Sequence, residues 1–356
     1  MEYLLRQHQS HSPQDPSRRL VLGGDVGGTH TNLALAWAGN RKVSLAVSFH
    51  FPTPGLRDLA APLREITAYA KRRYGAVIEH AALALAGPII PGRRAQLTNA
   101  DLRIDPGSLK HKVGLRDLHL MNDFDAIGYG INFLRRGDVL EMPPRRPSRR
   151  RADHPTRAII GAGTGLGKSI LIYDKSLGLF RPHPSEGGHA DFPSTAPWER
   201  ELVDFIKARE PGKQTVSYED LLSGRGLERL YQFLRQRQPT PPSPISRQID
   251  RAEEKALLIS QHIPQDETCR ETFHLLLQLM AKCARNFALD TLALGGIFLA
   301  GGILAKNIPH LRTDLFRQYF EENDRHREIL QQIPIKVVTN YDVSLYGAAF
   351  AATLQG

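Results

Sequence analysis

The stretch RAIIGAGTGLGKSILIYD, residues 157–174, poses the question that decides the fold. From Ala162 onward it fits a relaxed phosphate-binding P-loop pattern, which ends in Gly167-Lys168-Ser169. A P-loop leads directly into a helix, but Ile170–Tyr173 is rich in β-forming residues and is followed by turn residues. A strand pattern also precedes the loop. The stretch therefore predicts a β-hairpin, in which Lys168 is a surface lysine without a required catalytic task.

A second hairpin of the same kind is predicted near the start of the chain. RLVLGGDVGGTHTNLALAWAG, residues 19–39, predicts a strand at Leu20–Leu22, a glycine turn at Gly23–Thr29 and a strand at Asn32–Trp37. Such a spaced repeat indicates two similar halves, each with a hairpin whose glycines let the backbone approach phosphate. The alternative is a pair of plain hairpins that need glycine only for turn geometry.

Length and composition indicate a soluble globular protein with two domains. The chain has 356 residues, of which 41% are hydrophobic and 24% charged, and no apolar run reaches membrane-spanning length. Residues 1–19 lack an apolar signal-peptide segment and predict a flexible tail. Two cysteines, Cys269 and Cys283, without a CxxC motif, argue against a disulfide framework or a cysteine zinc site, so we expect an intracellular protein.

Much of the net charge of +10 lies in one segment. PPRRPSRRRADHPTR, residues 143–157, carries six arginines, has no aromatic residue and shows no helical periodicity. These features favour a solvated loop over a patch that binds anions or nucleic acid. A proline-rich stretch at 235–248 predicts a surface loop between helices.

Further stretches place polar residues at the ends of predicted strands. LHLMNDFDAIGYGI, residues 118–131, predicts a strand that ends at Asn122 and Asp123 and a helix just after it. An acid at the carboxyl end of a strand in an α/β protein lies where ligands usually bind. HAALALAGPIIPG (80–92), followed by LTNADL (97–102), and GIFLAGGILAKN (296–307) also predict strands that end beside glycine or polar residues. HPSEGGHADF (183–192) predicts an irregular loop, and SYEDLLSGRGL (217–227) a helix start. By contrast, the apolar spacing of TFHLLLQLMAKCARNFALDTLAL (272–294) indicates a core helix.

Taken together, GDVGGTHTNLAL, MNDFDA, GAGTGLG, SEGGHADF, SYEDLLSGRGL and FLAGGIL resemble the bacterial-type glucokinase family of the hexokinase–actin–Hsp70 fold group. The resemblance runs from Leu20 to the end of the chain. It implies an α/β, two-domain actin/hexokinase-like (ribonuclease H-like) fold with a central cleft. The small domain would comprise 20–133 and 337–356, with a C-terminal helix from about Val343, and the large domain 134–336.

The resemblance also implies roles for individual residues. Asp123 would be the catalytic base, the alternative being a cap of the following helix. Glu219 would bind sugar, the alternative being a favourable charge at a helix start capped by Ser217. Asp25 would hold Mg²⁺ through water, the alternative being a turn residue. The implied glucose ligands are Asn122, Asp123, Glu186, His189, Glu219 and Asn99, with Thr98 beside them. The implied ATP-binding residues are Gly24, Asp25, Val26, Gly27, Gly28, Thr29, Gly163, Thr164, Gly165, Gly301 and Gly302.

The predicted activity is a glucokinase that transfers the γ-phosphoryl of ATP, with Mg²⁺, to the 6-hydroxyl of D-glucose at the entry to glycolysis. The resemblance implies a cytoplasmic homodimer without a membrane or nucleic-acid partner. Alternatives are a related hexose or N-acetylhexosamine kinase, a non-catalytic sugar sensor, and, from another class, a P-loop NTPase or nucleic-acid-binding module. One departure from the family pattern is His30 after Thr29, where the family usually has asparagine. The sequence leaves open glucose against mannose, and ATP against ADP or polyphosphate.

Overall fold

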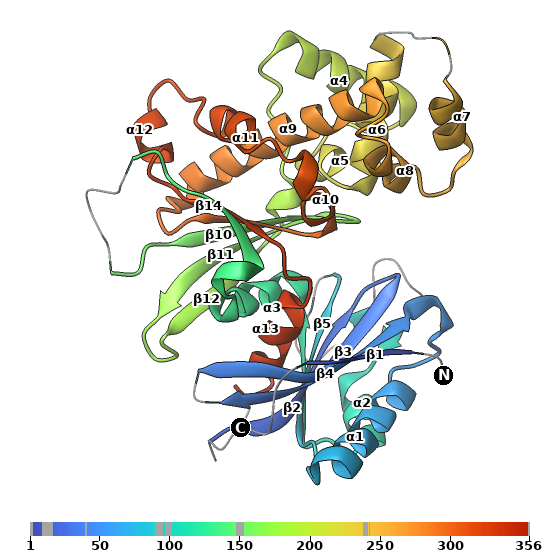
Figure 1. The fold of residues 1–356 in the computed structure, drawn as a ribbon, viewed down its shortest axis with the longest axis vertical. Coiled ribbons are helices and arrows are strands. Elements are labelled where there is room, and N and C mark those ends of the chain that lie inside the picture. The colour runs from blue at the N-terminus through green and yellow to red at the C-terminus, as the bar shows by residue number, and fades with distance from the viewer. Residues whose placement is uncertain are drawn as a thin grey trace. The chain divides into compact units, whose positions relative to one another are not determined.

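The chain forms two compact units in the computed structural model (Figure 1). Unit 1 comprises Met1–Asp138, Leu171–Pro184 and Asn340–Gly356, and unit 2 comprises Val139–Ile170 and Ser185–Thr339. The predicted division lies close to these bounds but did not include Leu171–Pro184 in the first unit. The structure describes residues 3–8, 17–39, 41–87, 89, 95–96, 102–146, 153–237, 241 and 243–354.

Unit 1 contains a six-stranded sheet with the order β1-β4-β3-β2-β5-β8. The predicted first hairpin is confirmed, because β2 pairs with β3 antiparallel. Its strands extend further than predicted, since Gly23 and Gly24 lie inside β2. A Cβ at Gly23 would lie 2.7 Å from the Ala349 nitrogen, so this glycine permits a helix to approach the strand. The strands are β1 (Leu4–Gln7), β2 (Arg19–Val26), β3 (His30–Gly39), β4 (Lys42–Pro52), β5 (His80–Leu85) and β8 (Asp117–Asn122).

Helices cover both faces of this sheet. Side chains alternate along β2, so that Leu22 shares a core with Leu63 of α1, whereas Val21 shares a core with Ala349 of α13. Figure 1 accordingly shows α1 and α2 on one side of the strands and α3 and α13 on the other. The helices are α1 (Ala60–Tyr74), α2 (Pro106–Val113), α3 (Asp123–Gly130) and α13 (Val343–Ala351).

Helices α3 and α13 contact each other through backbone atoms. A Cβ at Gly347 would lie 1.7 Å from the Ala126 carbonyl oxygen, and one at Gly130 would lie 1.9 Å from the Val343 carbonyl oxygen. Only glycine permits such an approach. The predicted C-terminal helix from Val343 is thus confirmed, and it belongs to unit 1.

The predicted flexible tail at 1–19 is wrong for its first described part. Strand β1 pairs antiparallel with β4, with Leu4 opposite His50. The ring of Tyr3 packs against Phe49 and Phe51 at centroid distances of 5.5 and 5.2 Å. Pairing with β4 and aromatic packing therefore order a segment whose sequence alone does not predict a strand.

The second sheet has the order β12-β11-β10-β13-β14-β9. The predicted second hairpin is confirmed, because Ile170–Tyr173 lies within β11 and β11 is the neighbour of β10. No helix follows Lys168 directly, which excludes the P-loop interpretation. The strands are β9 (Val139–Met142), β10 (Arg157–Ala162), β11 (Leu166–Asp174), β12 (Leu179–Ser185), β13 (Ile297–Ala300) and β14 (Ile335–Val338).

The two sheets share one topology. In chain order, β2, β3, β4, β5 and β8 occupy the same relative places as β10, β11, β12, β13 and β14. In each sheet the first strand pairs parallel with the fourth, as β2 does with β5 and β10 with β13. The predicted repeat of two similar halves is confirmed, with β1 and β9 as additions at the sheet edges.

Unit 2 carries its helices around the long helix α9. The predicted core positions Phe273, Leu276 and Met280 of α9 are buried in one cluster with strands β10, β13 and β14. Figure 1 shows α4 to α9 gathered together in this unit. Its helices are α4 (Pro197–Arg209), α5 (Tyr218–Leu221), α6 (Gly224–Arg237), α7 (Pro244–Arg251), α8 (Lys255–Gln261), α9 (Glu267–Thr291), α10 (Gly302–Lys306), α11 (Thr313–Phe320) and α12 (Arg327–Leu330).

The remaining elements are short. The 3-10 helices are Thr53–Gly55, Ile131–Phe133, Arg136–Asp138, Gly187–His189 and Ile308–His310, and the strands β6 (Ala95–Gln96) and β7 (Arg103–Ile104) form a separate pair. Within the described part of the chain, none of the helices combines the length and the apolar character that a membrane span requires.

Of the two predicted surface loops, only the proline-rich one is corrected. Residues 147–152 of the arginine-rich segment lie outside the described residues, but Arg145 and Arg146 are ion-paired with Glu321 and Glu328 at 3.4 and 2.8 Å. Both arginine side chains are exposed, as predicted for a solvated segment, and the ion pairs attach them to other residues of unit 2. The proline-rich loop is shorter than predicted, because α7 begins at Pro244 with Ser243 as its cap. Proline is well tolerated at the first position of a helix.

We expect Gly347→Ala to lower the free energy of unfolding by about 3 kcal/mol or more, because the added methyl group overlaps a backbone oxygen of α3. Urea denaturation measures the change. Gly137→Ala is the matched control, because nothing lies within 4 Å of a Cβ there, and its effect should stay within about 1 kcal/mol. Equal stability of the two variants would contradict the close contact of α3 and α13.

Candidate functional site

In unit 1, two carboxylates lie at the same edge of the sheet. Strands β2, β5 and β8 are parallel, and Asp25 aligns with Ala84, which in turn aligns with Met121. Asp25 is therefore at the carboxyl end of β2, and Asp123 follows the carboxyl end of β8 directly. Both residues are half-buried. This edge is where open α/β sheets bind ligands.

The start of α3 fixes the position of Asp123. Asn122 is the cap of this helix, because its Oδ1 accepts a hydrogen bond from the Phe124 N–H at 2.8 Å. Its amide nitrogen also donates to the carbonyl of Gly87 at 3.1 Å. Asp123 Oδ1 accepts from the same Phe124 N–H at 3.0 Å. The capping role considered as an alternative for Asp123 is thus performed chiefly by Asn122.

Burial changes the acidity of three carboxyl groups here. Burial raises the pKa of Asp123 to about 7, and the negative charge of Asp25 adds to this effect, whereas the Phe124 N–H opposes it. Burial also raises the pKa of Asp25, against a hydrogen bond of 2.6 Å from the Ser344 hydroxyl to its Oδ2. Burial raises the pKa of Asp125 to about 6. A carboxyl group that titrates near 7 can accept a proton at neutral pH.

The turn between β2 and β3 contains the predicted ATP-binding residues Gly27, Gly28 and Thr29. The N–H of Gly27 donates to the His30 carbonyl at 2.9 Å. Thr53 holds the turn from the side, because its N–H donates to the Thr29 carbonyl and its hydroxyl donates to the Gly27 carbonyl. Thr29 and His30 are exposed. The turn is thus rigid, and the departure from the family pattern, His30, presents its side chain to solvent.

The turn between β10 and β11 is the counterpart in unit 2. The Gly163 N–H donates to the Gly165 carbonyl at 2.9 Å, and the Gly163 carbonyl accepts from the Gly224 N–H at 2.9 Å. Gly301, at φ +92°, packs against β10, since a Cβ there would lie 2.3 Å from the Ala162 carbonyl oxygen. The predicted ATP-binding residues Gly163, Gly165, Gly301 and Gly302 therefore flank β10, with Thr164 exposed at the tip.

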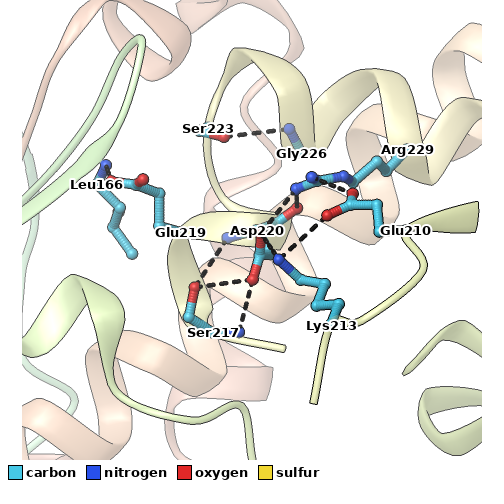
Figure 2. Close-up of polar contacts among 9 residues, drawn as sticks. All are labelled: Leu166, Glu210, Lys213, Ser217, Glu219, Asp220, Ser223, Gly226 and Arg229. Atoms are coloured by element: carbon cyan, nitrogen blue, oxygen red, sulfur yellow. Dashed lines mark hydrogen bonds and ion pairs between the residues drawn. The ribbon is translucent and has the colours of Figure 1, made fainter. Parts of the chain in front are cut away.

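Glu219 is joined to this turn. Its Oε2 accepts a hydrogen bond of 2.9 Å from the Leu166 N–H, and a Cβ at Gly165 would lie 2.6 Å from the same oxygen (Figure 2). A side chain that only balances the helix dipole would not be bound to another strand. Glu219 thus connects α5 with the beginning of β11.

A polar network holds α5 in place. Ser217 caps the helix as predicted, and its N–H and hydroxyl donate to Asp220 Oδ2 at 2.9 and 3.0 Å. Lys213 and Arg229 both lie 2.9 Å from Asp220 Oδ1, and Arg229 also binds Glu210 (Figure 2). Two cations and a capping box on one aspartate fix the orientation of the segment that carries Glu219.

The loop after β12 contains two glycines where it approaches β11 closely. A Cβ at Gly188 would lie 1.8 Å from the Leu166 carbonyl oxygen, and one at Gly187 would lie 3.0 Å from Lys168 Cδ. Because both positions lack a side chain, the loop lies directly on β11. The flanking residues Glu186 and His189 have side-chain exposures of 79% and 62%, with 4.0 Å between Oε2 and Nε2. The structure therefore brings these two predicted sugar ligands together on the surface of unit 2.

The prediction that Lys168 is a surface residue is wrong. The sequence indicated a surface lysine, but the side chain is buried at 5% exposure. Its Nζ lies 4.5 Å from the ring centre of Tyr218 and 5.1 Å from that of Phe287. A strand pattern cannot reveal this burial, because residues from α5 and α9 provide the cover.

The predicted sugar ligand Asn99 and its neighbour Thr98 lie outside the described residues. The interpretation from sequence missed Ser344 as a partner of Asp25, because the two residues are far apart in the chain. It also gave no role to Asp125, which lies within the quoted MNDFDA motif and whose Oδ1 is buried without a hydrogen-bond partner.

The carboxylate of Asp25 could bind Mg²⁺, which needs fewer protein ligands than a metal ion that side chains surround completely. Among the described residues, no three His, Cys, Asp or Glu side chains gather closely enough to hold a metal ion. Asp25 offers one half-buried carboxylate beside a glycine turn. Mg²⁺ typically keeps several waters and binds through one or two carboxylates together with phosphates, so this arrangement fits it.

Comparison with known proteins identifies extensive similarity. The family model described as Glucokinase matches residues 22–355. The chain is 33% identical to the glucokinase of Nostoc punctiforme, over 94% of this chain and 98% of that protein. The fold is similar to that of Balamuthia mandrillaris glucokinase solved with glucose (TM-score 0.75, 22% identity, 94% of each chain). It is also similar to a ROK family glucokinase from Streptomyces griseus solved with glucose and AMPPNP (TM-score 0.62, 20% identity, 95% of this chain and 100% of that one). These folds confirm the predicted α/β architecture with two sheets.

We expect a ¹³C NMR titration of the free protein to show Asp123 with a pKa of about 7, and Asp25→Asn to lower that value. The negative charge of Asp25 disfavours ionisation of Asp123, whereas asparagine carries no charge. Burial remains in the variant, so the pKa should stay above the ordinary aspartate value. A pKa of Asp123 that is the same in both proteins would show that the two carboxyl groups do not interact.

Proposed function

Because the chain belongs to the glucokinase family, we propose that it transfers the γ-phosphoryl group of ATP to the 6-hydroxyl of D-glucose, giving glucose 6-phosphate and ADP. The similarity to named glucokinases over nearly the whole chain supports this activity. The structures from B. mandrillaris with glucose, and from S. griseus with glucose and AMPPNP, support the choice of substrates. The observation in this chain that carries the proposal is the half-buried Asp123 at the end of β8, whose pKa is raised to about 7.

In the proposed mechanism, Asp123 is the base. The 6-hydroxyl oxygen forms a bond to the γ-phosphorus, the bond from that phosphorus to the β–γ bridging oxygen breaks, and ADP leaves with the bond electrons. The hydroxyl proton passes to the carboxylate of Asp123. With a pKa of about 7, a substantial fraction of this group is ionised at neutral pH, and its conjugate acid still holds the proton well.

Glucose recognition is assigned to residues of both units. We propose that Glu219, Glu186 and His189 of unit 2 bind sugar hydroxyls, with Asn122 and Asn99 of unit 1 contributing. The exposed positions of Glu186 and His189 on a loop that lies on β11 support this role. Carboxylates and imidazole nitrogens accept hydrogen bonds from the hydroxyl groups that distinguish sugars. A site built to hydrogen-bond hydroxyl groups rejects analogues that lack them.

The glycine turns are assigned to ATP. We propose that Gly24–Thr29 of unit 1 and Gly163–Gly165 of unit 2 contact phosphate groups, and that Gly301 and Gly302 contact the nucleoside. The glycine-rich composition of both turns and the hydrogen bonds that hold them in place support this assignment. Asp25 would hold Mg²⁺ through water, and the ion would neutralise charge on the phosphates.

The cellular setting follows from the same proposal. An enzyme that makes glucose 6-phosphate acts at the entry to glycolysis, in the cytoplasm. Both described cysteines, Cys269 and Cys283, are free and buried, which agrees with a reducing compartment. The homodimer implied by the resemblance is a prediction that light scattering tests.

The activity is tested by measuring sugar phosphate formation from ATP and Mg²⁺ with glucose, mannose, fructose and N-acetylglucosamine as acceptors. The proposal requires glucose to have the highest kcat/KM. A preference for N-acetylglucosamine would replace it with an N-acetylhexosamine kinase. A folded protein that binds glucose but phosphorylates none of the four sugars would be a sugar sensor.

We expect Asp123→Asn to lower kcat by at least about a thousandfold, because the amide cannot accept the proton. The same variant should melt at a higher temperature than the wild type at pH 8. The pKa of Asp123 is raised on folding, so its ionisation destabilises the folded protein as the pH rises through about 7. At pH 4 the difference in melting temperature should disappear.

Asp174→Asn is the matched control for this variant. Asp174 lies at the end of β11, where Ser176 donates hydrogen bonds to it, and this bonding lowers its pKa. Turnover should be unchanged in the control. An Asp123→Asn protein that keeps turnover within tenfold of the wild type would refute the role of Asp123 as the base.

A further inference from the structure

Lys168 is a buried cation for which the proposed reaction gives no role. It lies in β11, directly after the glycine turn, and its side chain is 5% exposed. Its Nζ lies over the rings of Tyr218 and Phe287, at 4.5 and 5.1 Å from their centres. Aromatic faces attract a cation, but they offset only part of the free energy needed to remove an ammonium group from water.

Within the described part of the chain, Lys168 lacks a direct counter-ion. Lys282, also buried in unit 2, pairs with Glu199 at 2.7 Å. For Lys168, no carboxylate oxygen of the described residues lies within ion-pair distance. Lys168 also contacts the thiol of Cys283, and burial raises the pKa of this thiol to about 11, against the effect of Lys168. A neutral thiol does not cancel a positive charge. The electric field of the ammonium group therefore extends further through the interior than it would beside a carboxylate.

Two segments that carry predicted sugar ligands meet at this ammonium group. Tyr218, whose ring it contacts, directly precedes Glu219. Gly187, whose Cβ would lie 3.0 Å from Lys168 Cδ and 3.7 Å from its Nζ, directly follows Glu186. The same two segments are joined by a hydrogen bond of 3.1 Å from the Tyr218 N–H to the Ala190 carbonyl. The cation thus lies between the backbones that carry two carboxylates.

We propose that Lys168 is a positioning residue for glucose: its uncompensated charge, buried between the Glu186 and Glu219 segments, holds these carboxylates in the arrangement that accepts sugar hydroxyls. The proposal rests on the proposed function of the same site. Lys168 is too deeply enclosed to contact substrate itself. It therefore acts on sugar binding rather than on phosphoryl transfer, and its removal should change KM far more than kcat.

Lys168→Met and Lys168→Gln test the proposal, because both remove the charge but differ in shape and polarity. Each should raise the KM for glucose by about 10- to 100-fold, as expected for weakened hydrogen bonds to charged acceptors. The kcat at saturating glucose should stay within about threefold of the wild type. The melting temperature of Lys168→Met should not fall, because a buried charge is replaced by an apolar chain of similar length.

Lys282→Met is the control for loss of a buried lysine in the same unit. It breaks an ion pair and leaves Glu199 buried, so it should lower the melting temperature but keep the KM for glucose within about twofold of the wild type. The proposal is overturned if both Lys168 variants keep the wild-type KM, or if kcat falls while KM does not change. These outcomes presuppose turnover by the wild type, whose absence would instead overturn the proposed function.

Discussion

The backbone contact between α3 and α13 is the constraint on which the chemistry of unit 1 depends. It exists because Gly130 and Gly347 have no side chains. The contact fixes the first turn of α3, where Asp123 lies, and it fixes α13, whose Ser344 hydroxyl binds Asp25. Two carboxyl groups are thereby kept near each other and half-buried. Their raised pKa values follow from this arrangement and not from any property of the residues alone.

In unit 2 the same hairpin also supports two neighbouring segments. Its glycine turn is followed by a strand, β11, whose first residues serve as a platform: Glu219 binds the Leu166 N–H, and the loop with Gly187 and Gly188 lies directly on the strand. The repeated topology of the two sheets thus provides two similar glycine turns, and each unit adds its own acidic side chains beside the turn. Function differs between the halves through the residues placed around a shared element.

The sequence predicted what local patterns determine. Both hairpins, the strand before Asp123 and the long helix α9 follow from strand propensity, glycine turns and apolar spacing, and all are observed. The sequence could not predict features that depend on distant partners. Lys168 is buried by rings from α5 and α9, the strand β1 is ordered by pairing with β4, and Ser344 reaches Asp25 from the other end of the chain. The proline-rich loop is shorter than its composition predicts, because proline is also well tolerated at the first position of a helix.

The most direct test of the account is the pH dependence of kcat/KM with both substrates well below saturation, because this ratio reports the ionisation of the free enzyme. If burial makes Asp123 the base, kcat/KM should fall tenfold per pH unit on the acid side of an apparent pKa of about 7. A profile that stays flat from pH 8 down to about pH 5 would show a base with an ordinary carboxyl pKa. That result would contradict the claim that the half-buried carboxyl pair of unit 1 sets the chemistry.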